Sequence, residues 1–77
     1  MKEYTLMNQL NPKKLLNSKW TAVKPSGGEK HFLISDIELD EDGAIIGCQL
    51  EAVMTRRQSN IDWRSLADKS RWMRGWR

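Results

Sequence analysis

The chain has 77 residues, 30% of them charged, with one cysteine and one histidine. This length allows a single domain that buries only about 60% of the surface exposed by its unfolded chain. A lone cysteine excludes an internal disulfide, and one cysteine with one histidine excludes the common zinc sites, so packing must stabilise the fold. We therefore expect neither a metal nor another cofactor.

The net charge of +3 is the sum of three blocks that alternate in sign. Residues 1–30 carry six lysines and two acids (+4), residues 31–55 six acids and no lysine or arginine (−6), and residues 56–77 seven basic residues and two acids (+5). This order predicts oppositely charged surfaces, and the acidic block would repel nucleic-acid phosphates. A single cysteine is typical of a reducing compartment, which predicts a cytoplasmic protein. We expect no signal peptide and no membrane span, because no run of about 18 apolar residues occurs.

The N-terminal third predicts an arm, a helical turn and a strand, in that order. Residues 1–10 lack a sustained hydrophobic period and are expected to form a flexible arm, with one β-rich domain at residues 11–77. Asn11 and Pro12 suit the cap and first position of a short helical turn, from which Leu15 and Leu16 would dock on the core. Residues 19–24 have strand character, and Pro25 with the two following glycines ends the strand.

Two longer strands follow, at residues 30–39 and 44–57, joined by an acidic turn at residues 40–43 (Asp-Glu-Asp-Gly). Gly43 supplies the left-handed residue of that turn. The apolar alternation of the first strand changes phase, which predicts a bulge near Ser35 or Asp36. In the second, one face carries Ile46 and every second residue up to Met54.

The C-terminal part predicts a turn at residues 58–60, a short fourth strand at residues 60–63 and a helical segment. Asp62 and Asp68 are placed as N-caps of helical pieces at residues 63–67 and 69–74. Trp72 and Trp76 are four residues apart, so a continuing helix would put them on one face, whereas Gly75 favours an earlier end.

We therefore predict a mainly β (α+β) fold. It is a small antiparallel, three- to four-stranded curled sheet, with the N-terminal helical turn and the C-terminal helical segment covering it. The large apolar residues of these elements and one cysteine should form the core: Leu16, Trp20, Phe32, Ile34, Ile46, Cys48, Leu50, Ala52, Trp63, Leu66 and Trp72.

Catalytic patterns are missing. No nucleophile and acid are arranged around His31, and general-base catalysis needs a poised partner within reach. The acids of residues 36–42 lack the spacing of a calcium loop, and Gly27-Gly28 lacks the pattern of a phosphate-binding loop. The sequence therefore predicts a protein that is not an enzyme.

Tryptophans and arginines concentrate near the C-terminus, and this pattern has two interpretations. Exposed rings and arginines could bind single-stranded nucleic acid by stacking and by phosphate contacts. Alternatively, the rings belong to the core and the arginines to a solvated or protein-binding surface. Whether Trp76 and the acidic turn are functional or structural stays open. The candidate binding surface consists of Arg56, Arg57, Arg64, Arg71, Arg74 and Trp76.

Several segments resemble a family of short tryptophan-rich bacterial proteins of uncharacterised function. They are Ser-Lys-Trp-Thr-Ala-Val within residues 11–23, residues 30–34, Leu-Glu-Ala-Val within residues 50–57, residues 61–68, and Trp-x-x-x-Trp at residues 72–76. The resemblance implies a soluble bacterial protein of one domain and transfers no catalytic or ligand residue. The expected function is a non-enzymatic protein-interaction or structural module, with single-stranded nucleic-acid binding as the alternative.

Overall fold

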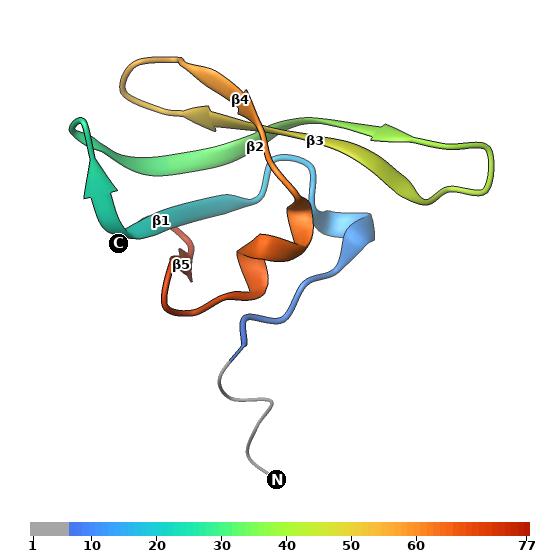
Figure 1. Cartoon of the computed structure of the whole chain (residues 1–77), viewed down its shortest axis with the longest axis horizontal. Coiled ribbons are helices and arrows are strands. Elements are labelled where there is room, and N and C mark those ends of the chain that lie inside the picture. Colours follow the sequence, from blue (N-terminus) through green and yellow to red (C-terminus); the bar gives the residue numbers. More distant parts are fainter. Residues whose placement is uncertain (1–6) are drawn as a thin grey trace, which may run out of the picture.

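A five-stranded antiparallel sheet is the framework of the computed structural model, which describes residues 7–77 (Figure 1). The strands are β1 (Lys19–Ser26), β2 (Glu29–Leu39), β3 (Ile45–Ala52), β4 (Gln58–Asn60) and β5 (Trp72–Arg74), in the spatial order β4-β3-β2-β1-β5. Within residues 7–77, short 3₁₀ helices occur before β1, as η2 (Pro12–Lys14), and before β5, as η3 (Trp63–Ala67). The predicted mainly β antiparallel fold is confirmed, but the predicted number of three to four strands was too low. The sheet is not closed, because β4 and β5 form its two edges.

The predicted N-terminal helical turn is present as η2. The Asn11 side chain accepts a hydrogen bond from the Lys13 backbone N–H at 3.0 Å, and Pro12 occupies the first position, as expected for a capped turn. Of the two leucines that follow η2, only one docks on the core, because the side chains of adjacent residues point in different directions. Leu15 is buried, whereas Leu16 is exposed and is not part of the core.

The hairpin of β2 and β3 contains two bulges, of which one was predicted. Ile34 pairs with Leu50 and Asp36 with Gln49, so Ser35 is the extra residue, and this confirms the expected bulge. A second bulge lies at Ile46. It reverses the alternation, so that Ile45 packs against the core and Ile46 is 60% exposed. Placing Ile46 in the core was therefore wrong.

The strand predicted at residues 44–57 ends earlier, at Ala52. Arg56 has a positive φ of 63°, which extended backbone does not adopt, so a loop separates β3 from β4. Met54, expected on the inner face, lies in this loop and is exposed. The fourth strand occupies residues 58–60, where the sequence predicted a turn, and not residues 60–63.

The C-terminal helical segment is not confirmed beyond the single turn of η3. Asp62 caps η3 by accepting a hydrogen bond from the Arg64 backbone N–H at 3.1 Å. The carboxylate of Asp68 accepts in the same way from the backbone N–H and also from the hydroxyl of Ser70, at 2.9 and 2.6 Å, but a turn follows it and not a helix. The chain then pairs with β1 as strand β5, and Trp72 lies opposite Ala22.

Tryptophans take a central place in the core. Trp20 is 2% exposed and Trp72 is 8% exposed, and the ring of Trp72 meets Phe32 edge-to-face with 5.4 Å between centroids. Trp63 packs against the core but is only partly buried, so its assignment as a core residue holds in part. The buried apolar cluster comprises Leu15, Trp20, Phe32, Ile34, Cys48, Leu50, Ala52, Leu66 and Trp72.

The predicted N-terminal arm is only partly within the described residues. Residues 1–6 lie outside them. Asn8 is buried, and its side-chain amide donates to the carbonyls of Leu66 and Trp72, at 2.9 Å each. Met7 forms an isolated bridge with Asp68. In the part of the chain that the structure describes, no helix is both long and apolar enough to cross a membrane.

Candidate functional site

A depression of about 540 Å³ lies between the two edges of the sheet. Ser59 of β4 and Trp72 of β5 both line it, although four neighbouring-strand steps separate these edges within the sheet. Residues of both edge strands therefore border one depression on the sheet, which is not closed. We call it the basic groove. It is lined by Ala22, Lys24, Ser26, Glu29, Phe32, Leu50, Arg57, Ser59, Ile61, Ser70, Arg71 and Trp72.

A change of register in β1 shapes one side of the groove. Thr21 pairs with His31 and Ser26 with Glu29, so the four residues 22–25 of β1 face a single residue of β2. In this stretch the backbone N–H of Val23 instead donates to the carbonyl of Arg71 at 2.9 Å. The end of β1 accordingly bends away from its earlier course (Figure 1). This bend carries Lys24 and Ser26 to the groove.

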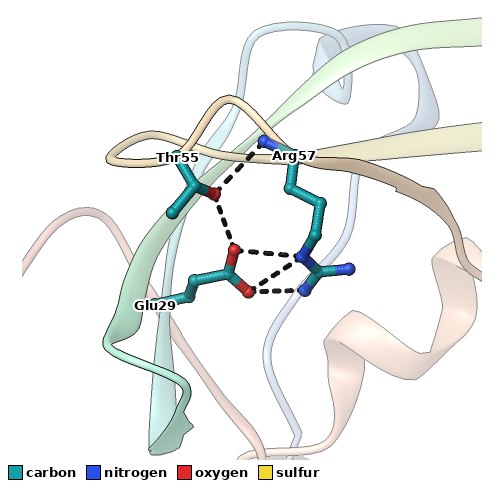
Figure 2. A network of polar contacts seen from close by, with 3 residues as sticks. All are labelled: Glu29, Thr55 and Arg57. Atoms are coloured by element: carbon teal, nitrogen blue, oxygen red, sulfur yellow. Dashed lines mark hydrogen bonds and ion pairs between the residues drawn. The ribbon is translucent and has the colours of Figure 1, made fainter.

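Glu29 fixes Arg57 on the opposite side. The Nε of Arg57 donates to both carboxylate oxygens of Glu29, at 3.2 and 3.0 Å, and Nη2 donates to Oε1 (Figure 2). The hydroxyl of Thr55 donates to Oε2 at 2.6 Å and accepts from the backbone N–H of Arg57 at 3.2 Å. Glu29 is buried, whereas the Arg57 side chain is largely exposed. Within residues 7–77, Nη1 of Arg57 makes no hydrogen bond, so one edge of the guanidinium is available.

The same contacts determine the charge of the carboxylate. The hydrogen bonds from Arg57 first, and from Thr55 second, lower the pKa of Glu29 from 4.5 to about 2. Glu29 is therefore ionised at neutral pH. The groove carries three cations, Lys24, Arg57 and Arg71, against this one anion, which leaves a net charge of +2.

The groove combines this positive rim with an apolar base. Phe32, Leu50 and Trp72 are buried core residues whose edges reach the hollow, whereas Lys24 and Arg71 are exposed at its rim. Its volume is within the usual range for ligand sites. Such a surface suits a ligand that has both an anionic and an apolar group. Among residues 7–77, no three histidine, cysteine or acidic side chains gather as they would around a metal ion.

The six residues predicted as one binding surface lie at separate places. Arg57 and Arg71 meet in the basic groove. Arg74 lies 5.7 Å from the centroid of the Trp20 ring and donates to the Gln9 carbonyl, in a different depression.

The remaining three residues of that prediction line no part of the basic groove. The guanidinium of Arg64 lies 5.8 Å from the Trp63 ring, on η3. Arg56 is exposed in the loop after β3. Sequence reasoning missed Lys24, Ser26 and Glu29, because the register shift that brings them to the groove has no local signature except Pro25.

Trp76 is 43% exposed but is held in place on the sheet. Its Nε1 donates to the carbonyl of Phe32 at 2.8 Å, and Lys19 Nζ lies 5.3 Å from its ring centroid. The ring of His31 is a further neighbour, with 6.2 Å between centroids. Lys19 therefore occupies part of the environment that an incoming base would need.

Comparison with known proteins identifies the family without assigning the groove. A family model described as tryptophan-rich protein (DUF2389) matches residues 18–77, a range that includes all five strands and the whole basic groove. No curated protein and no solved structure matches the chain. The match confirms the resemblance drawn from the sequence motifs. The chain belongs to this tryptophan-rich family, whose function is unknown.

Proposed function

We propose that this protein is a non-enzymatic protein-interaction module and that the basic groove binds an acidic, extended segment bearing an apolar side chain. One observation carries the proposal: Lys24, Arg57 and Arg71 surround a hollow whose base is formed by core aromatic and aliphatic side chains. Carboxylates of a partner would meet the cationic rim, and an apolar side chain would contact Phe32 and Trp72. The gap between two strand edges is also a suitable place for extended backbone, since edges recruit peptides by β-pairing.

The tryptophans favour a protein partner over single-stranded nucleic acid. Stacking on bases requires aromatic faces that are free. Trp20 and Trp72 are buried, and Trp76 is tied to the sheet by its indole N–H and accompanied by Lys19. The ring of Trp63 is partly buried, with Arg64 beside it. No row of open rings follows the arginines across the described surface.

The groove is better suited to binding than to acid–base catalysis. Its lining includes neither histidine nor cysteine, and its one carboxylate is bound to Arg57. A carboxyl group with a pKa of about 2 has no proton to donate at neutral pH and is a weak base.

Fluorescence anisotropy of labelled peptides and oligonucleotides tests the proposal. An acidic peptide containing leucine should bind, with affinity that falls as salt rises, whereas a basic peptide of equal length should not. The groove variant Lys24→Glu/Arg71→Glu should weaken binding by about tenfold or more, because two attractive charges become repulsive.

The matched control is Lys13→Glu/Arg64→Glu, which changes the net charge equally but outside the groove. It should bind the acidic peptide nearly as the unmodified protein does. Absence of binding at low salt, or equal losses in both double variants, would contradict the proposal. Tight binding of oligothymidylate that only the groove variant loses would assign the groove to nucleic acid instead.

A further inference from the structure

The hairpin of β2 and β3 extends beyond the rest of the sheet as a two-stranded arm. Residues 36–39 of β2 pair with residues 45–49 of β3, and within residues 7–77 no third strand pairs with residues 36–47. Figure 1 shows this end of the hairpin projecting away from η3 and β5. Ile37 and Ile45 pack against the core and hold the base of this segment, whereas its tip has two strands alone, which have marginal stability in water. We call residues 36–47 the acidic arm.

The acidic arm exposes apolar side chains among carboxylates. Leu39 is 52% exposed, and Ile46 is directed to solvent by the bulge in β3. Asp40 is occupied in the turn, where its carboxylate accepts from the backbone N–H groups of Asp42 and Ala44 at 2.9 Å each. The arm includes five acids and no basic residue: Asp36, Glu38, Asp40, Glu41 and Asp42.

The arm therefore has the chemistry that the basic groove is proposed to bind. The two exposed apolar side chains lie on opposite faces of the arm, because Leu39 pairs with Ile45, which faces the core, whereas the bulge turns Ile46 the other way. An arm inserted between the two sheet edges can therefore bring Leu39 to the apolar base of the groove and Ile46 to its margin, and the surrounding carboxylates match the net positive rim. The arm lies in the acidic block of the sequence, residues 31–55, whereas the cations of the groove come from the two basic blocks on either side of it. Electrostatic complementarity of this kind selects partners and sets the register of an interface.

The positions of arm and groove permit two such contacts at once. Glu29 and Phe32 line the groove near the start of β2, whereas Leu39 lies at its other end. A strand of 11 residues is about 35 Å long, so the two surfaces are well separated in one copy. Two copies related by a two-fold axis, with their β2 strands antiparallel, place each arm at the groove of the other. Closed two-fold dimers are the commonest form of homo-oligomer.

We propose that a second copy of this chain is the partner, and that each copy inserts its acidic arm into the basic groove of the other. This inference rests on the proposed function of the groove and specifies its ligand. Leu39 and Ile46 become buried against the partner, and the arm carboxylates pair with Lys24, Arg57 and Arg71 of the other copy.

Sedimentation equilibrium of the full chain tests the inference directly. The unmodified protein should show twice the monomer mass at high concentration and low salt, and dissociate as salt rises. The arm variant Leu39→Ser/Ile46→Ser and the groove variant Lys24→Glu/Arg71→Glu should each weaken dimerisation by about tenfold or more. The control Lys13→Glu/Lys14→Glu changes the net charge equally at exposed residues outside both the groove and the arm, and it should still dimerise.

Mixing the two deficient variants gives the sharpest result. The arm variant retains a working groove and the groove variant retains a working arm, so the mixture should form a 1:1 heterodimer through one contact. Near-UV circular dichroism checks that each variant is folded, and the salt dependence of the unmodified protein needs no variant at all.

The outcomes separate this inference from the function on which it rests. A chain that is monomeric at every concentration, yet binds an acidic peptide in its groove, overturns the dimer and leaves the proposed function intact. A dimer that persists in both variants also overturns the inference, because another surface must then form it. A monomer that binds no acidic peptide overturns both.

Discussion

Two buried tryptophans differ in one hydrogen bond, and this difference predicts unequal responses to the same substitution. The indole N–H of Trp20 donates to the hydroxyl of Ser18 at 2.8 Å. The indole N–H of Trp72 is also buried but has no hydrogen-bond partner among residues 7–77. We expect Trp20→Phe to destabilise the fold considerably more than Trp72→Phe.

The magnitude follows from the two nitrogen environments. Phenylalanine removes the same atoms at both positions, so the loss of packing largely cancels in the comparison. Trp20→Phe also loses a hydrogen bond, which contributes about 1 kcal/mol. Trp72→Phe removes an unsatisfied buried donor, which relieves a cost of about 1–3 kcal/mol. The free energies of unfolding of the two variants should therefore differ by about 2–4 kcal/mol.

Urea denaturation followed by far-UV circular dichroism measures this difference without relying on tryptophan emission. With slopes typical of small proteins, the two midpoints should be separated by about 1 M urea or more, and Trp72→Phe should have the higher one. Equal midpoints, or a lower midpoint for Trp72→Phe, would show that the indole N–H of Trp72 is not left unpaired in the folded protein.

Three further predictions concern Glu29, Cys48 and Arg56. Because the folded-state pKa of Glu29 is lowered to about 2, its contacts with Arg57 stabilise the fold fully above about pH 4.5 and are lost as the pH falls towards 2. The difference in thermal stability between the unmodified protein and Glu29→Gln should shrink across that window, and a constant difference would contradict the assignment. Burial first, and the charge of Asp62 second, raise the pKa of the Cys48 thiol. A thiol reagent should therefore label Cys48 only as fast as the protein unfolds. Rapid labelling without denaturant would refute its burial. Arg56→Gly should raise the free energy of unfolding by up to about 1 kcal/mol, since glycine adopts the positive φ of position 56 without strain. The substitution should leave peptide binding unchanged. A loss of binding in anisotropy measurements would show that Arg56 belongs to the binding site.

The sequence predicted features that local chemistry decides. The acidic turn forms as expected, with Gly43 at a φ of 86° and its N–H donating to the carbonyl of Asp40 at 3.0 Å. The bulge at Ser35 was predictable because the apolar alternation changes phase there. The bulge at Ile46 was not, because Ile45 and Ile46 are equally apolar and the pattern cannot tell which of the two faces inward.

The C-terminal strand shows where local reasoning fails. Asp68 and the spacing of Trp72 and Trp76 are compatible with a helix, and only Gly75 nearby opposes its continuation. The deciding contact is with Ala22, 50 positions away, because the edge of β1 supplies hydrogen-bond partners to the backbone of β5. Pairing over such a distance overrides local propensity.

The candidate site was predicted by residue type more than by position. Arg57 and Arg71 were expected in a binding surface, and they do line one groove, which stays a candidate. Lys24 joins them only because β1 shifts its register against β2. Glu29 was not expected at all, since an acid between a glycine turn and a strand does not indicate that it will bind an arginine 28 positions away.

Glu29 reduces the positive charge of the groove, yet it makes Arg57 a better recognition group. An exposed arginine loses side-chain conformational freedom when it binds a ligand, and a residue already held in position loses less. Glu29 holds Arg57 through Nε and Nη2 and leaves Nη1 open, while Lys24 and Arg71 keep the net charge positive. The tryptophans that characterise the family serve mainly to build the core beneath this rim. Recognition is therefore better sought in Lys24, Arg57 and Arg71 than in the aromatic residues.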